Sequence, residues 1–97
     1  MNIFEIKDKT GREIYLTKER WRHVTSPISP HAYMTNYIEY IKETLTNPYK
    51  IISDMDNPNK AYYFRYHKDK KEYLKIVVNY LNGRGFIITS YFVRNIR

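Results

Sequence analysis

Alternating polar and apolar positions, rich in β-branched and aromatic residues, dominate the last third of the chain and predict three antiparallel strands. The second and third strands, over 72–80 and 86–93, flank Asn82-Gly83. Asn-Gly between two such segments is the strongest short signal for a β-hairpin. A polar turn over 68–71 joins the first strand, over 61–67, to the second. The rest of the chain is expected to cover this sheet.

A two-residue hairpin loop fixes which side chains share a face of the sheet, because successive side chains point to opposite faces. Counting from this loop places Arg65, Thr89 and Tyr91 on one face. The same count places Lys75 and Ser90 on the other face. Both faces carry polar residues, so the pattern leaves open which one meets solvent. The expected cross-strand pairs are Val78 with Ile87, Ile76 with Thr89, and Leu74 with Tyr91.

Helical spacing of apolar residues replaces alternation upstream of the sheet. Thr17 is a suitable cap for a first helix that runs to Val24 and ends at Ser26-Pro27. A second helix is predicted from Ser29-Pro30 to the residue before Asn47-Pro48. The apolar positions of its core-facing side are Met34, Ile38, Ile41 and Leu45. Both helices are expected to pack on the sheet.

Length and the remaining segments set the expected fold class. At 97 residues the chain has the length of one domain. A further short strand is expected over 49–53, and the segments 3–6 and 13–16 around Gly11 are compatible with an amino-terminal hairpin. We therefore expect a single α+β domain over residues 1–97. Its two amino-terminal helices would pack on a twisted antiparallel sheet of about four strands.

The chain is positively charged and rich in tyrosine, and both features bear on its binding partners. The chain has 17 Lys plus Arg against 10 Asp plus Glu, a net charge of +7, and 11 tyrosines. Cations interleaved with aromatic rings suit a surface that binds phosphates and stacks bases, so RNA is the expected partner. The amino terminus lacks the apolar stretch of a signal peptide, and no segment reaches the ~20 apolar residues of a membrane span. We expect a cytoplasmic protein with no membrane association, and the oligomeric state stays open.

The residue types that are missing exclude several kinds of chemistry. There is no cysteine, which excludes disulfides and thiolate chemistry. His23, His31 and His67 do not have the spacing of a metalloprotease helix, and the three glycines form no phosphate-binding loop. We therefore expect no metal and no cofactor. Histidine, arginine and hydroxyl side chains remain, and these suit metal-independent RNA cleavage, in which the 2′-hydroxyl of the substrate is the nucleophile.

Four short segments in a fixed order carry a family resemblance. They are Trp21-x-His23-Val24, Pro30-His31-x-x-Met34, Thr44-Leu45-x-Asn47-Pro48-Tyr49-x-Ile51 and Phe86-Ile87-Ile88-Thr89-Ser90-Tyr91. With these segments the chain resembles the phage-associated branch of the barnase–EndoU–colicin–RelE nuclease fold, over nearly everything after Leu16. The resemblance implies helices packed on an antiparallel sheet and a metal-independent ribonuclease, often a toxin or part of a mobile element. A protein inhibitor or antitoxin would neutralise such a toxin.

The resemblance also implies site residues, because His23 and Thr89 stand at matching positions. We expect His23 to act as general acid or base, Arg65 to clamp the phosphate, and Thr89 and Tyr91 to position the RNA or donate protons. The family's H-P-E segment is altered here to Pro30-His31-Ala32, and a serine follows Thr89 where alanine is usual. The residues expected to contact RNA or its phosphates are Arg20, His31, Lys75, Ser90 and Arg94.

Two other functions stay open at the level of the sequence. A non-catalytic RNA-binding module would share the charge and the tyrosines, and it would show steeply salt-dependent binding without products. A small protein-interaction or inhibitor module would form a complex that survives nuclease treatment. Cleavage of RNA in the presence of a chelator separates the enzyme from both alternatives.

Overall fold

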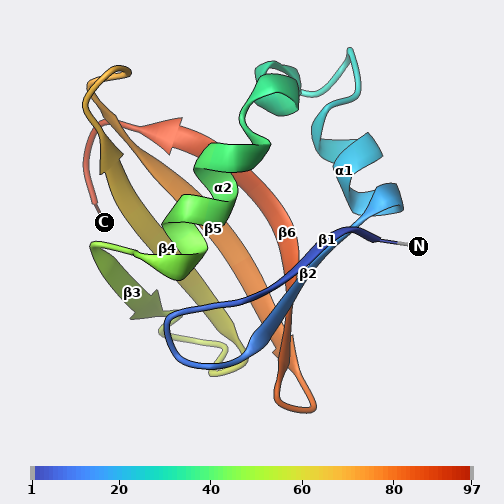
Figure 1. Cartoon of the computed structure of the whole chain (residues 1–97), viewed down its shortest axis with the longest axis vertical. Coiled ribbons are helices and arrows are strands. Elements are labelled where there is room, and N and C mark those ends of the chain that lie inside the picture. Colours follow the sequence, from blue (N-terminus) through green and yellow to red (C-terminus); the bar gives the residue numbers. More distant parts are fainter. Residues whose placement is uncertain (1, 97) are drawn as a thin grey trace.

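One six-stranded sheet with its longest helix on one face forms the fold (Figure 1). The computed structural model describes residues 2–96. The elements in chain order are β1 (Asn2–Lys7), β2 (Glu13–Thr17), α1 (Lys18–Val24), the 3-10 helix η1 (Ala32–Asn36), α2 (Ile38–Thr46), β3 (Lys50–Ser53), β4 (Lys60–His67), β5 (Glu72–Leu81) and β6 (Arg84–Val93). The strand order is β1-β2-β6-β5-β4-β3. The α+β class is as predicted, but the sheet has six strands, not about four.

Two tight turns organise the three central strands as the sequence predicted. Asn82 and Gly83 both have positive φ, 54° and 79°, as the two central residues of a primed hairpin turn require. Lys71, with φ of 56°, closes the turn between β4 and β5. The three strands pair antiparallel along most of their length.

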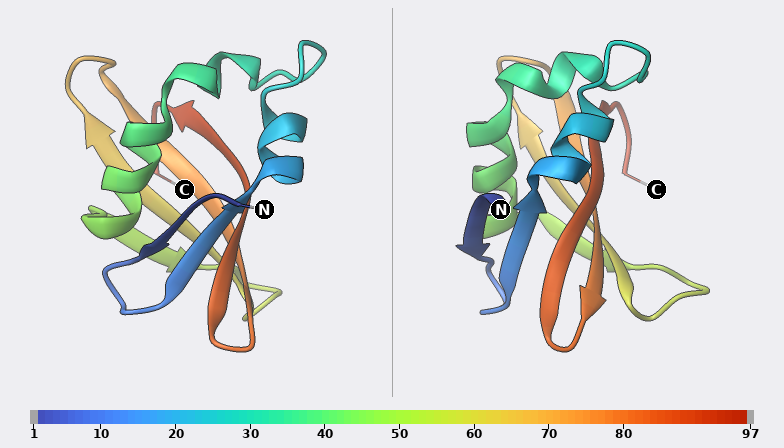
Figure 2. Two further views of the ribbon diagram at one scale, coloured as in Figure 1. Left: turned by 45° about the vertical axis from the view of Figure 1, so that its right-hand side comes forward. Right: turned by 90° about the vertical axis from the view of Figure 1, so that its right-hand side faces the viewer.

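The predicted amino-terminal hairpin is present, and it extends the sheet in a way the sequence did not indicate. β1 and β2 pair antiparallel around Gly11, whose φ is +89°. β2 then runs parallel to β6 through the pairs Ile14–Gly85 and Tyr15–Phe86. The sheet is therefore mixed, because this one junction joins the two ends of the chain in parallel (Figures 1 and 2).

A buried polar cluster ties this hairpin to the centre of the sheet. Asp8 accepts hydrogen bonds from the backbone N–H groups of Thr10 and Arg12, both at 2.9 Å. Its other carboxylate oxygen accepts a hydrogen bond from the Tyr63 hydroxyl, which lies 2.6 Å from the Tyr80 hydroxyl. Burial, and then the hydrogen bond to Asp8, raise the pKa of Tyr63, so its hydroxyl stays protonated and donates. The cluster connects the turn between β1 and β2 to β4 and β5.

The junction of β2 and β6 depends on the absence of a side chain at Gly85. A Cβ atom at this position would overlap the end of the buried Ile14 side chain and lie 2.9 Å from Cγ1 of Val78. We expect Gly85→Ala to lower the free energy of unfolding by about 1 to 3 kcal/mol, as overpacking does. Denaturant titration measures the loss. Adding Ile14→Val removes the clashing methyl group, so the double variant should lose less than the sum of the two single losses, and simple additivity would contradict this account.

The first helix forms as predicted, whereas the second is broken. Thr17 caps α1 by accepting a hydrogen bond from the Arg20 N–H at 3.1 Å. The predicted helix from Pro30 is instead a 3-10 turn followed by α2, with the break at Tyr37. Thr35 and Asn36, two poor helix formers, precede this break. The predicted core side is nevertheless confirmed, because Met34, Ile41 and Leu45 are fully buried and Ile38 packs against the core.

α2 gives the sheet two different faces. The face it covers, called the helix face below, contributes the buried side chains Tyr63, Leu74, Ile76, Val78 and Ile87 to the core. The opposite side is called the outer face. Figure 2 shows α2 on one side of the central strands and the chain after Val93 on the other. The positions of the outer face in β4, β5 and β6 include Tyr62, Phe64, Tyr66, Tyr73, Lys75, Val77, Thr89 and Tyr91.

A β-bulge at Ile88 changes the predicted register. Val78 pairs with Ile87 as predicted, but Val77 pairs with Thr89, so Ile88 is the extra residue. Beyond the bulge Lys75 pairs with Tyr91, and Ile76 and Leu74 pair with Ser90 and Phe92 in place of the predicted Thr89 and Tyr91. The prediction that Thr89 and Tyr91 share a face with Arg65 is therefore wrong. One inserted residue moves every side chain after it to the opposite face.

Candidate active site

Lys75 lies in the middle of the outer face, surrounded by aromatic rings. Its ammonium nitrogen is 4.6 Å from the ring centroid of Tyr62, 5.6 Å from that of Tyr91 and 5.9 Å from that of Phe64. Each distance is within the range of a cation–π interaction. Lys75 is half-buried, so the rings restrict where its positive charge can lie. The result is a positioned cation on a surface of aromatic side chains.

A histidine from the segment before η1 reaches this cluster. The rings of His31 and Tyr91 stack with 4.6 Å between centroids and 11° between planes. Two hydrogen bonds fix the segment: the His31 N–H donates to the Ser29 hydroxyl at 3.0 Å, and the Phe92 N–H donates to the Tyr33 hydroxyl at 3.0 Å. Since the Phe92 N–H is a backbone donor of β6, the second bond holds this segment against that strand.

Thr89 completes the cluster on the outer face. It lies two residues before Tyr91 on the same strand, and its side chain is half-buried. The structure therefore places four of the sequence-predicted residues, His31, Lys75, Thr89 and Tyr91, at one end of β6 and its neighbour β5. Together they supply an imidazole, an ammonium group and two hydroxyls, which can exchange protons and stabilise negative charge.

His23 and Arg20 lie on α1, apart from these contacts. His23 is exposed, as its position on the helix predicted, and borders an open hollow of about 350 Å³. The hollow is lined by Glu19, Arg22, His23 and Ser26, which belong to α1 and the chain just after it. Arg20 is also exposed on α1. Within the described residues, the hollow brings His23 together with α1 side chains and not with the outer-face cluster.

Arg65 lies on the helix face, opposite Leu74, and the bulge in β6 places Ser90 on the same face. The Arg65 guanidinium donates to the Asn47 carbonyl at 3.0 Å and forms an ion pair of 3.4 Å with Glu43. Ser90 is 1% exposed, and its hydroxyl has no hydrogen-bond partner among the described residues. Neither shares a surface with Thr89 or Tyr91, so their predicted grouping with the site is corrected. Arg94 is exposed just after β6.

His67, beside the turn between β4 and β5, is buried. Its Nε2 lies 3.1 Å from the Thr44 hydroxyl, which donates its own proton to the Tyr40 carbonyl at 2.8 Å. Nε2 must therefore be the donor to Thr44, and the neutral ring leaves Nδ1 free of hydrogen, 3.9 Å from a Glu43 carboxylate oxygen. Helical and strand periodicity alone gave no sign of this contact between α2 and β4.

Burial of His67 makes stability depend on pH. Burial lowers its pKa, against the opposing influence of Glu43 and Asp69 and together with the charge of Arg65. An unfolded histidine titrates near pH 6.5, so as the pH falls below about 6.5 the unfolded chain binds a proton before the folded one. We expect the free energy of unfolding to fall over this window. Denaturant titrations between pH 8 and pH 5 should show a smaller decline for His67→Leu, and equal declines would contradict this assignment.

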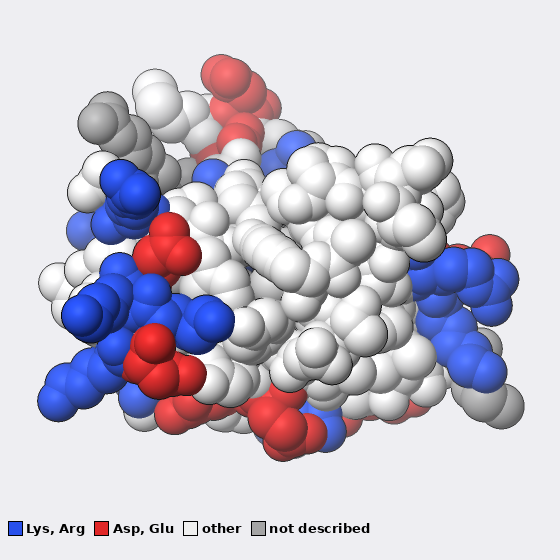
Figure 3. Space-filling view, turned by 90° about the horizontal axis from the view of Figure 1, so that it is seen from above, with Lys and Arg blue, Asp and Glu red and all other residues white. Residues whose placement is uncertain are grey.

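The charge distribution separates the molecule into an uncharged top and charged ends. No Lys, Arg, Asp or Glu occurs between residues 24 and 38. Figure 3 shows the result: uncharged side chains cover the middle of this view, and Lys and Arg gather on both sides of it. His31 is the one residue of this segment that can carry a positive charge. The other residues of this segment therefore carry no positive charge that would favour phosphate binding.

Two structural findings concern metals and membranes. In the described part of the chain, no group of three or more His, Asp or Glu side chains lies close enough to hold a metal ion. No helix over residues 2–96 is both long and apolar enough to cross a membrane.

Comparison with known proteins places the chain in a family. No curated protein and no solved structure matches it. One family model does match, described as phage-Barnase-EndoU-ColicinE5/D-RelE like nuclease2, and the match covers residues 4–97. This agrees with the resemblance carried by the four ordered segments and with the α+β fold. The chain therefore belongs to the family of phage barnase–EndoU–colicin E5/D–RelE-like nucleases.

Proposed function

We propose that the protein is a metal-independent endoribonuclease with its active site on the outer face, around His31, Tyr91 and Lys75. One observation carries the proposal: the imidazole of His31 stacks on Tyr91, and the Lys75 ammonium nitrogen lies 5.6 Å from the centroid of the same ring. An imidazole exchanges protons near neutral pH, and an ammonium group stabilises the charge that develops on a phosphate. Membership of a nuclease family supports a nuclease in general terms.

The reaction follows from the groups on this face. A base removes the proton from the 2′-hydroxyl, the 2′ oxygen bonds to phosphorus, and the bond from phosphorus to the 5′ oxygen breaks. An acid returns a proton to the 5′ oxygen, so the products are a 2′,3′-cyclic phosphate and a 5′-hydroxyl. We assign one proton transfer to His31 and the other to the Tyr91 hydroxyl, with Lys75 and Thr89 holding the phosphate oxygens.

The exposed residues of α1 are assigned to RNA binding and not to proton transfer. His23 lines the hollow together with Arg22, and Arg20 is exposed on the same helix. We assign His23 and Arg20 to contacts with RNA on either side of the cleaved bond. Arg94, exposed after β6, is assigned to the same kind of contact.

A substrate change tests the proposed reaction directly. The protein is incubated in chelator with an RNA oligonucleotide and with a matched oligonucleotide in which every 2′-hydroxyl is replaced by hydrogen. Cleavage of the RNA alone, giving ends with a 2′,3′-cyclic phosphate, is the expected result. Cleavage of both substrates, or RNA cleavage that stops in chelator, would reject the 2′-hydroxyl mechanism.

A toxin role belongs to the same proposal. A ribonuclease that draws its acid, base and cation from its own side chains acts as soon as it meets RNA in the cytoplasm, and a protein inhibitor would then be needed to protect the producing cell. Expression in bacteria should arrest growth, and His31→Ala should relieve the arrest. Equal arrest by both proteins would separate toxicity from the proposed site.

A further inference from the structure

Three tyrosines form a second aromatic cluster on the outer face, at the end of the sheet where the turn joins β4 to β5. The rings of Tyr66 and Tyr73 meet edge to face with 5.2 Å between centroids, and those of Tyr49 and Tyr73 lie 6.2 Å apart. Tyr66 is 45% exposed and Tyr49 is 70% exposed. Exposed rings gathered in one place mark an interaction site more strongly than the same rings scattered singly. We call this group the tyrosine triad.

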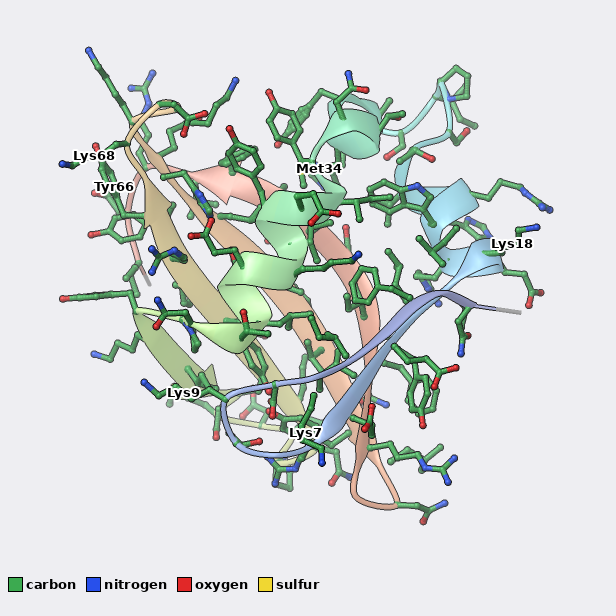
Figure 4. The ribbon with its side chains drawn as sticks, viewed as in Figure 1. Lys7, Lys9, Lys18, Met34, Tyr66 and Lys68 are labelled. Carbon is green, nitrogen blue, oxygen red and sulfur yellow. The ribbon has the colours of Figure 1, made fainter. Side chains whose placement is uncertain are left out.

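The surroundings of the triad are positively charged. Lys50 begins β3 on the side of Phe64, and Arg94 follows the residue that pairs with Tyr73. Lys68 directly follows β4, two residues after Tyr66, and Figure 4 labels both residues near that end of the strand. Among the described strand residues that point outward from β4, β5 and β6, none is acidic. The triad therefore presents aromatic rings among cations.

The triad lies one step along the sheet from the candidate active site. Tyr73 pairs with Val93, which is two residues beyond Tyr91, and Tyr66 pairs with Tyr73. With ~6.7 Å between alternate residues and ~4.8 Å between strands, Tyr73 and Tyr66 lie roughly 8 and 12 Å from Tyr91. One strand of nucleic acid can therefore contact both places within a short run of nucleotides.

We propose that the tyrosine triad is a second binding subsite that stacks an unpaired base of the RNA, so that the substrate is single-stranded. Its role in cleavage depends on the proposed ribonuclease function, whereas its role in binding does not. Aromatic rings stack on bases of any sequence, and the neighbouring cations bind the backbone. A base inside a duplex has both faces covered by its neighbours, so a stacking subsite selects RNA whose bases are free.

Binding of an uncleavable ligand tests the subsite without relying on catalysis. The probe is a six-nucleotide 2′-O-methyl RNA, compared with the same strand in a duplex. We expect Tyr66→Ala and Tyr49→Ala to weaken binding of the single strand by about 5- to 100-fold. Tyr66→Phe keeps the ring and should bind as the natural protein does. Leu81→Ala, which truncates an exposed side chain at the far hairpin, is the matched control.

The outcomes separate this inference from the proposed function. Unchanged binding by Tyr66→Ala and Tyr49→Ala, or duplex binding as tight as that of the single strand, would overturn the subsite. If RNA is never cleaved but the tyrosine variants bind weakly, the subsite stands and the ribonuclease proposal fails. In the cleaving enzyme, Tyr66→Ala should raise KM for the hexanucleotide and leave cleavage of a dinucleotide, too short to reach the triad, unchanged. Thermal melting of each variant confirms that it folds.

Discussion

Replacing His31 with alanine should slow cleavage of RNA in chelator by about 10²- to 10⁴-fold, the usual contribution of one positioned acid or base. The reason is geometric. The rings of His31 and Tyr91 stack with 4.6 Å between centroids, and the Lys75 ammonium nitrogen lies 5.6 Å from the centroid of the same tyrosine ring. Initial rates on a defined oligonucleotide, with the folding of the variant checked by thermal melting, give the measurement.

The variant His23→Ala is the matched comparison, because the family resemblance points to that histidine. It is exposed in the α1 hollow with Arg22 and Ser26. We expect a change mainly in KM, since the proposed role of His23 is to contact flanking RNA. If His23→Ala abolishes turnover while His31→Ala leaves it intact, the acid or base is His23, and the outer-face assignment is wrong.

Replacing Lys75 with methionine should lower kcat by about 10²- to 10³-fold, the range seen when one stabilising donor is removed from a developing oxyanion. Methionine keeps much of the length of the side chain and its packing on Tyr62 and Tyr91. The variant therefore removes the charge with little loss of apolar contact. Rates measured across a range of salt concentrations should also show a weaker salt dependence in the variant.

Lys42 provides the control for this substitution. Its ammonium nitrogen lies 5.5 Å from the ring of Phe4 on the α2 side of the molecule, and it pairs with Glu39 at 3.4 Å. Lys42→Met removes the same charge from a similar setting away from the outer face, and it should leave kcat unchanged. Equal losses in the two variants would mean that the rate responds to net charge and not to the site.

The face of the sheet that carries the site was the hardest feature to predict. Turn chemistry at Asn82-Gly83 gave the correct hairpin and the correct first pairs. Ile87 and Ile88 are identical neighbours, so either can occupy the buried position, and the alternation does not reveal that Ile88 is bulged. The bulge placed every later residue of β6 on the face opposite to the predicted one. Thr89 and Tyr91 moved to the side of Lys75, and Ser90 moved into the core.

Contacts between segments that are far apart in the chain could not be predicted from the sequence either. The parallel junction of β2 and β6 rests on two residue pairs, and no local pattern marks them. The contact of His31 with Tyr91 is of the same kind, since it depends on a hydrogen bond between Tyr33 and the backbone of β6. Two local signals were correct, since the Thr17 cap and the hairpin around Gly11 were predicted and are present, but the helix start predicted at Ser29-Pro30 was wrong.

Whether the outer face binds RNA can be tested by chemical-shift mapping. The labelled protein is titrated with an uncleavable 2′-O-methyl RNA. We expect the largest chemical-shift changes on the backbone amides of Lys75, Thr89 and Tyr91 and on the side chain of His31. Changes concentrated on α2, Arg65 and His67 would place the RNA on the helix face and contradict the account.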